Sequence, residues 1–253
     1  MGAVYRTNGY ALAGTITRPF NEQIDVQAAL IGHTDGGHAA VSAANFNHKH
    51  IVSFNSAAIH SAGSHDPADD CHHSVISARV EGLNVLNVLT VDRIVARINC
   101  KHPPSPKSQT PKSTKLPDVE PLMLPFGAHI EGLKIAGCPV DIQFDCDLLG
   151  KHATWQDIVD HCKPTPKPEP GAPFVCSLVK NVVSACPGVN WNPKTGALEV
   201  KDFGNIFLAR LVLEPSRRWL TMLQLELGSA VQLVARVGSI ENNNVCTTCP
   251  PCC

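Results

Sequence analysis

The sequence predicts an all-β protein, a β-sandwich or β-roll of many short antiparallel strands. Three observations lead to this prediction. Apolar and polar residues alternate over 76–81 and again over 93–98, the pattern of strands with one buried face and one solvated face. The 20 prolines and 18 glycines interrupt the chain often, as many strands and turns require. A helical stripe is visible in one short segment, near 154–162.

The first 102 residues read as a succession of strands. Asn8-Gly9 and Asp35-Gly36-Gly37 are typical turn sequences between short strands. Paired strands follow at 74–100. The apolar stretch 83–92 inside this unit fits either a strand or a buried turn of helix. The expected short strands before the unit are 3–16, 24–32, 38–46 and 50–60.

The paired-strand unit has an echo later in the chain. VEGLNV at 80–85 returns as IEGLKI at 130–135, within a second set of strands at 119–149 where Gly137 marks a turn. We therefore expect one β-rich domain over 1–240, divisible into sub-lobes 1–102 and 119–240. A proline- and lysine-rich linker at 103–118 would join them.

The second half contains the one predicted helix. Thr154 followed by Asp157 forms a capping-box start, and Pro164 ends the segment. A second proline-rich connector spans 163–173. An apolar segment covers 174–185, a turn follows at 192–196, and strand-like runs cover 197–214 and 220–240. A cysteine-rich tail occupies 241–253.

Composition and motifs restrict the function classes. The net charge of −1 gives no electrostatic reason to expect nucleic acid as a partner. No apolar run approaches the ~20 residues that span a bilayer. Residues 1–19 lack the apolar core of a secretion signal, so the export route stays open. The nucleophile-elbow, zinc-protease and phosphate-loop motifs are all absent, so the sequence predicts that the protein is not an enzyme.

Cysteine usage is high, with 11 residues, which is typical of an oxidising compartment. We expect an extracellular protein or one on the surface of a cell or spore. Cys71 and Cys100 flank the paired-strand unit and are predicted to pair. The other predicted intrachain disulfides are Cys138–Cys146 and Cys162–Cys176.

Four cysteines lie together in the tail, at Cys246, Cys249, Cys252 and Cys253. Adjacent cysteines rarely pair with each other and readily bond to two different partners. The tail therefore favours disulfides between chains. The same spacing of thiolates also fits a zinc or iron–sulfur site, and a tail without a function is a third interpretation.

A polar loop before the paired strands is dense in potential metal ligands. Imidazole and carboxylate together suit Zn, Cu or Ni. A pH-sensitive surface and a merely solvated loop are the alternatives. Asp145 and Asp147 would share a strand face and offer a further candidate site, for Ca²⁺. The candidate ligands in the loop are His65, Asp69, Asp70, His72 and His73.

The run SVISARVEGLNVLNVLTVDRIVARINC at 74–100 resembles a segment of the choice-of-anchor P family of bacterial surface proteins. AHIEGLKIAGCPVDI at 128–142 and LQLELGSAVQLVARVGS at 223–239 are similar to later segments of that family. The resemblance covers about residues 8–240. It implies a secreted or surface-displayed β-rich domain with no assigned enzymatic activity and no catalytic residues. This chain ends in a cysteine cluster instead of an apolar anchor or sorting signal.

The sequence as a whole predicts a structural surface protein that assembles with copies of itself into a filament or coat. Its tail cysteines would cross-link neighbouring subunits. The alternative is a surface binding module, which would use the His/Asp loop for a metal ion or a sheet face for a glycan or host ligand.

Overall fold

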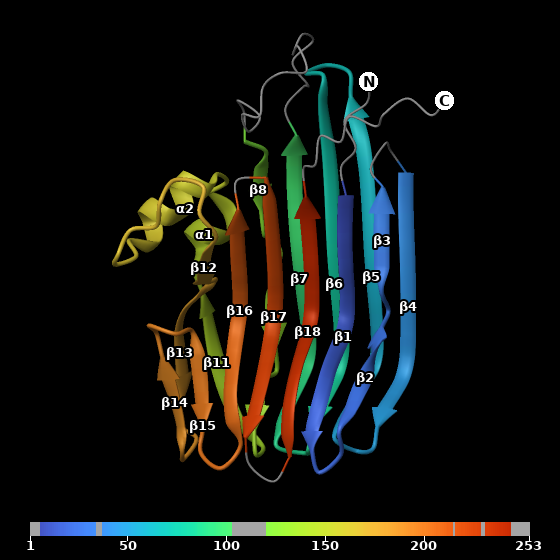
Figure 1. Ribbon diagram of the computed structural model, residues 1–253, viewed down its shortest axis with the longest axis vertical. Coiled ribbons are helices and arrows are strands. Elements are labelled where there is room, and N and C mark those ends of the chain that lie inside the picture. Colours follow the sequence, from blue (N-terminus) through green and yellow to red (C-terminus); the bar gives the residue numbers. More distant parts are fainter. Residues whose placement is uncertain (1–5, 34–36, 103–119, 215, 229–230, 244–253) are drawn as a thin grey trace.

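The protein is a β-sandwich. The computed structural model describes residues 6–33, 37–102, 120–214, 216–228 and 231–243. Within them the chain forms two nine-stranded antiparallel sheets that pack face to face (Figure 1). This confirms the predicted fold class.

Sheet 1 brings the beginning and the end of the described chain together. Its first strand pairs with its last, from Arg6 opposite Asn243 to Arg18 opposite Gln232. Across the sheet, the strands run in the order β14-β15-β16-β17-β18-β1-β2, with β12 beside β16 and β3 beside β1. Their bounds are β1 Arg6–Arg18, β2 Glu22–Gln27, β3 Leu30–His33, β12 Phe174–Ser177, β14 Val189–Asn192, β15 Ala197–Val200, β16 Gly204–Glu214, β17 Arg217–Gly228 and β18 Gln232–Asn243.

Sheet 2 is built on four long strands that follow one another in sequence, β4 to β7, which we call the meander. The sheet order is β13-β11-β10-β7-β6-β5-β4, and β8 and β9 also pair with β7. The bounds are β4 Gly37–His48, β5 Val52–Asp66, β6 Cys71–Val85, β7 Leu89–His102, β8 Leu122–Leu124, β9 His129–Glu131, β10 Lys134–Ile135, β11 Cys138–Phe144 and β13 Val179–Ser184.

The repeated sequence has a structural counterpart. VEGLNV lies in β6 and IEGLKI in β9 and β10, and the two copies flank β7 in the same register: Ile94 faces both Val80 and Ile130. Arg93 lies 3.4 Å from a carboxylate oxygen of each flanking glutamate, Glu81 and Glu131. The glycines of both copies have φ near +65°, a backbone conformation that disfavours any side chain.

The core lies between the sheets, where β1 and β18 pack over β6 and β7. Period-two alternation buries one side of each long strand. The segment 83–92 is a hairpin, β6 turning into β7, and contains no helix. Each large aliphatic side chain that is fully buried between the sheets contributes about 1.5–3 kcal/mol to the stability of the fold. The inward residues of β6 and β7 include Ile76, Ala78, Val80, Leu83, Leu89, Val91, Ile94, Ala96 and Ile98, each at most 1% exposed.

A small polar layer also crosses the core. Asn242 of β18 donates to the hydroxyl of Ser74 in β6 at 2.9 Å, and that hydroxyl lies 2.9 Å from Nε2 of His102. Thr7 and Ser61 join the sheets again through hydroxyl groups 2.7 Å apart. Buried polar groups without partners are costly, so these contacts fix how the two sheets lie on each other.

Two short helices lie at the left in Figure 1, where α1 contacts β8. The predicted helix is confirmed: α2 spans Trp155–Cys162, and Thr154 caps it in a capping box with Asp157. The sequence analysis missed α1, Cys146–Gly150, which Asp145 caps by accepting from the N–H groups of residues 147 and 148. Asp145 and Asp147 therefore do not share a strand face, as the calcium prediction assumed.

Two turn predictions have different outcomes. Asn8-Gly9 lies inside β1, so that prediction is wrong. A Cβ atom on Gly9 would lie 3.1–3.2 Å from atoms of Ile240 and Ile76, so the glycine permits close packing between strands. The turn at Gly137 is confirmed, between β10 and β11. Linker 103–118 and positions 35 and 36 lie outside the described residues.

Candidate metal centre

The β5–β6 hairpin presents a group of ligand atoms at its end. Antiparallel pairing sets Ser64 opposite His73 and Asp66 opposite Cys71. Because side chains alternate between faces, Asp66 falls on the same face as Ser64 and therefore as His73. The turn then brings in Asp69, whose Oδ1 accepts from the N–H of Cys71 at 3.1 Å.

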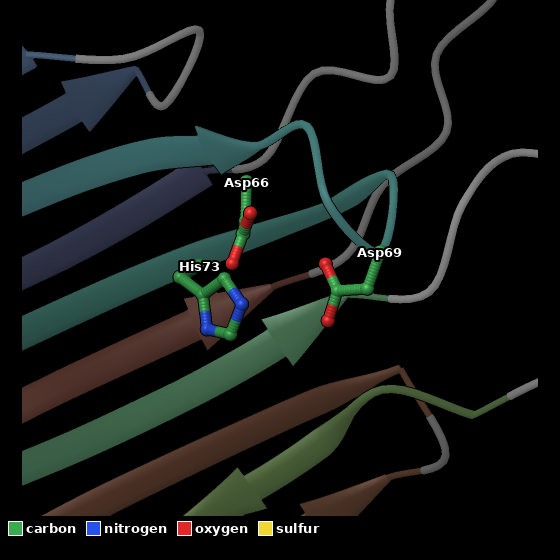
Figure 2. Close-up of side chains that lie close together, drawn as sticks. All are labelled: Asp66, Asp69 and His73. Carbon is green, nitrogen blue, oxygen red and sulfur yellow. The ribbon is translucent and has the colours of Figure 1, made fainter.

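These three side chains converge, as Figure 2 shows. Asp66, Asp69 and His73 each offer one ligand atom, and the three atoms lie within 4.8 Å of one another. Two carboxylates and one imidazole suit Zn²⁺ and other divalent transition ions, with the remaining positions open to water. The arrangement can therefore hold a metal ion at the solvent-facing end of the sandwich.

A lysine competes for the same carboxylate. Lys101 of β7, opposite His73 in the sheet, places Nζ 2.5 Å from Oδ2 of Asp69. The hydrogen bond from Lys101 holds the pKa of Asp69 below its usual value, and Asp69 raises the pKa of Lys101. A metal ion that used this oxygen would have to displace the ammonium group.

The structure divides the five predicted loop ligands. Asp69 and His73 belong to the converging group, which also contains Asp66, a residue outside the predicted set. His65 and Asp70 instead form a hydrogen bond at 3.0 Å, and the rings of His65 and His72 lie 4.6 Å apart. Asp66 would be found from the sequence only once the turn was placed at 67–70, because the strand register sets its face.

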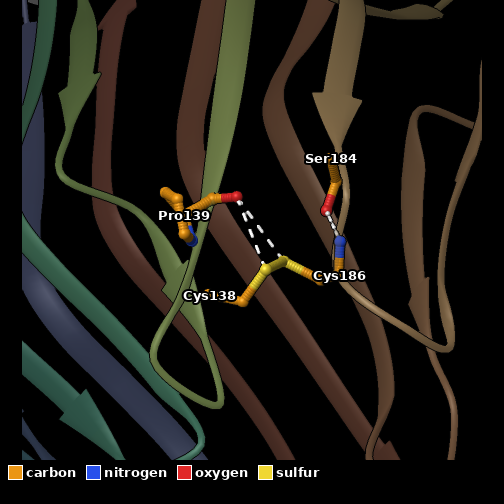
Figure 3. Close-up of a disulfide and its surroundings, with 4 residues drawn as sticks. All are labelled: Cys138, Pro139, Ser184 and Cys186. Atoms are coloured by element: carbon orange, nitrogen blue, oxygen red, sulfur yellow. Dashed lines mark hydrogen bonds between the residues drawn. A yellow bond between two sulfur atoms is a disulfide. The ribbon is translucent and has the colours of Figure 1, made fainter.

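A disulfide joins Cys138, at the start of β11, to Cys186, just after β13 (Figure 3). The Cα atoms are 5.7 Å apart. The predicted Cys138–Cys146 pair is wrong, because the extended β11 separates these residues and Cys146 begins α1 as an exposed free thiol. The bond closes a sequence separation of 48 residues and ties two neighbouring strands of sheet 2.

The other two predicted disulfides are also absent, since all four cysteines are free thiols. Cys100 lies opposite Ser74, and Cys71 lies opposite Asp66. The strand register therefore keeps Cys71 and Cys100 apart. Burial raises the pKa of Cys100 far above its usual value, which makes this thiol a poor nucleophile.

The thiols of Cys162 and Cys176 do meet. Their mutual hydrogen bond lowers the pKa of Cys162 and raises that of Cys176. The cysteines Cys246, Cys249, Cys252 and Cys253 lie outside the described residues.

The fold and the site define a class: an all-β sandwich domain with a candidate metal-binding end. Residues 3–170 match the family model described as Domain of unknown function (DUF8256), and the chain belongs to that family. No curated protein and no solved structure matches the chain. Among the helices of the described residues, none is long and apolar enough to cross a membrane.

Proposed function

We propose that the protein is a structural, surface-exposed subunit that associates with copies of itself through the free edge of β4. The supporting observation is the composition of this outermost strand. Its 12 residues contain no Lys, Arg, Asp, Glu or Pro. Natural edge strands usually carry such residues, because unpaired backbone groups otherwise recruit another strand.

Exposed apolar side chains also lie near β4, beside one ion pair at its end between Lys49 and Glu22. Val41 and Ala43 are only half-buried, so sheet 1 covers the inner face of β4 incompletely. Three large apolar side chains are exposed on or beside β2 and β3: Phe20, Val26 and Ile31 are 45%, 47% and 56% exposed. By contrast β13, the opposite end strand of sheet 2, is six residues long and carries Lys180.

A second copy of the chain fits this edge. Two β4 strands related by a two-fold axis would pair antiparallel, and a strand without Lys, Arg, Asp or Glu brings none of these charges against its copy. The Cys138–Cys186 bond supports the extracellular or cell-surface part of the proposal, since stable disulfides are typical of oxidising compartments.

Sedimentation analysis of the purified full chain tests whether it self-associates through the edge of β4. We expect a dimer or larger assembly for the natural protein and a monomer for Val41→Lys, because a lysine on the edge strand blocks strand addition. Val234→Lys is the control for an added surface lysine on a paired strand, in the interior of sheet 1, where Val234 is 51% exposed. A monomeric natural protein, or a Val41→Lys variant that still assembles, would contradict the proposal.

Cross-linking by the tail cysteines is a separate part of the proposal. Gel electrophoresis without reductant should show covalent multimers that disappear when Cys246, Cys249, Cys252 and Cys253 are all replaced by Ser. Non-covalent assembly through β4 should survive this replacement. Covalent multimers that persist in the four-serine variant would contradict the proposal that the tail cysteines cross-link subunits.

A second candidate function rests on the converging Asp66, Asp69 and His73. Under it, the β5–β6 end binds a divalent transition ion such as Zn²⁺. Titration calorimetry with ZnCl₂ should show one site that His73→Ala abolishes. Lys101→Met should tighten it, since the competing ammonium group is gone. Equal binding by the natural protein and His73→Ala would contradict this assignment.

A further inference from the structure

A cavity of about 290 Å³ lies on the outer face of sheet 1, over β16, β17 and β18. Three arginines line it, one from each strand: Arg210, Arg217 and Arg236. Strand pairing brings them together, since Arg210 faces Thr221 and Arg236 faces Gln224. Neither the family match nor the proposed self-association accounts for this concentration of guanidinium groups.

Trp219 organises two of these arginines. Its indole Nε1 donates to the hydroxyl of Ser239 at 2.5 Å, which fixes the ring in the sheet surface. The guanidinium carbons of Arg217 and Arg236 lie 5.5 Å and 5.7 Å from the ring centre. A guanidinium that stacks on an aromatic face keeps the N–H groups at its edge available for an anion.

The positive charge is only partly neutralised. Arg217 pairs with Glu241 at 2.7 Å, whereas Arg210 donates to the neutral amide oxygen of Gln224 at 3.2 Å. Within the described part of the chain, neither Arg210 nor Arg236 forms an ion pair with a carboxylate. The cavity therefore has two guanidinium groups that a ligand's anionic group can engage.

The lining also contains one carboxylate, Glu214, and one hydroxyl, Thr221. A carboxylate would repel a bare inorganic anion, but it accepts hydrogen bonds from hydroxyl groups. A ligand with both an acidic group and several hydroxyls uses the whole lining. The volume is near the lower limit for small-molecule sites, about 300 Å³, and fits one sugar ring.

We propose that this cavity binds a uronic acid unit of an acidic polysaccharide. The sugar carboxylate would lie between Arg210 and Arg236, and the ring hydroxyls would donate to Glu214 and contact Thr221. The proposal does not depend on self-association through β4, because the two surfaces lie on different sheets.

Titration calorimetry of the full chain with a galacturonic acid tetramer tests this site. Arg236→Gln, at an exposed position, should weaken binding about tenfold or more, because one charge-assisted hydrogen bond is lost. Arg210→Gln should act in the same direction. Arg97→Gln is the matched control, an exposed arginine on β7 of the other sheet, and should leave the affinity unchanged.

Two further ligands define the chemistry. A neutral glucose tetramer should not bind, and inorganic sulfate should bind much more weakly than the acidic tetramer. Three results would overturn the proposal: no binding of the acidic tetramer, equal affinities for the natural protein and Arg236→Gln, or sulfate binding as tight as that of the saccharide.

Discussion

The meander and the segment that follows it, residues 120–200, are built by different means. The four meander strands are 12 to 15 residues long, and turns of a few residues join them. The strands of the later segment have two to seven residues. Long strands accumulate enough apolar burial to be held by the core alone, whereas short strands bury little each.

The later segment compensates with specific bonds. The Cys138–Cys186 disulfide ties β11 to the end of β13. Arg218 of β17, 1% exposed, pairs with Glu120 at 2.8 Å, and the same carboxylate oxygen accepts from the N–H of Trp155 at the start of α2. Individual polar and covalent links therefore carry more of the stability here than in the meander.

The largest expected effect comes from opening a cavity in the meander. Ile94→Ala removes a fully buried side chain that lies between both copies of the repeat, and we expect a loss of about 4 kcal/mol in the free energy of unfolding. Leu148→Ala, in the five-residue α1, should cost about 2 kcal/mol because this marginal helix can relax around the gap. Urea unfolding measures both, and an equal or larger cost for Leu148→Ala would refute the comparison.

Loss of the disulfide should rank second. Replacing Cys138 and Cys186 together by Ser should lower the unfolding free energy by about 3 kcal/mol, since the bond closes a long loop in the unfolded chain. Cys146→Ser removes an exposed free thiol and should change stability by less than about 0.5 kcal/mol. If the double variant were as stable as the natural protein, the bond would not be what holds the later segment.

The buried ion pair should come third. Glu120→Gln keeps the side-chain shape but leaves the buried Arg218 without a counter-charge. Breaking a buried pair costs about 3–5 kcal/mol; because the Glu120 side chain is 21% exposed, we expect about 2 kcal/mol. Glu199→Gln, on the exposed surface of β15, is the control and should be nearly neutral. Similar losses from both variants would show that Arg218 is adequately solvated without its partner.

The difference between the long meander strands and the short elements of residues 120–200 also explains which elements the sequence could predict. Alternation over 76–81 and 93–98 gave β6 and β7 correctly, because a strand with one buried face repeats its pattern many times. The helix α1 was missed because five residues carry too little periodicity, and its signal is the single cap at Asp145. The turn prediction at Asn8-Gly9 was wrong because glycine is favoured both in tight turns and where strands pack closely.

Sites were harder to predict than strands because they depend on register. The His/Asp loop was recognised from its composition, but Asp66 joins His73 only through the pairing of Ser64 with His73. The Arg210, Arg217 and Arg236 group escaped notice entirely, since residues from three strands meet only after the sheet forms. The Cys138–Cys186 disulfide was not predicted for the same reason, because β11 and β13 are neighbours in the sheet but not in the sequence.

The smallest predicted effect concerns the cap of α1 and its dependence on pH. Burial alone would raise the pKa of Asp145, but the hydrogen bonds from His161 and from the N–H of Leu148 outweigh it and hold that pKa below its ordinary value. A carboxylate with a lowered pKa in the folded state stabilises the fold above its unfolded pKa. This stability is lost as the pH falls through the folded-state value.

Asp145→Ala should therefore cost about 1 kcal/mol at neutral pH, the usual loss for an N-cap. The gap between variant and natural protein should narrow as the pH falls below about 4. Urea unfolding at a series of pH values measures this. Asp160→Ala, which removes an exposed carboxylate of α2, is the control and should leave the neutral-pH stability almost unchanged. A constant gap at all pH values would mean that the charge of Asp145 does not support α1, and that packing alone holds this helix as it does the meander.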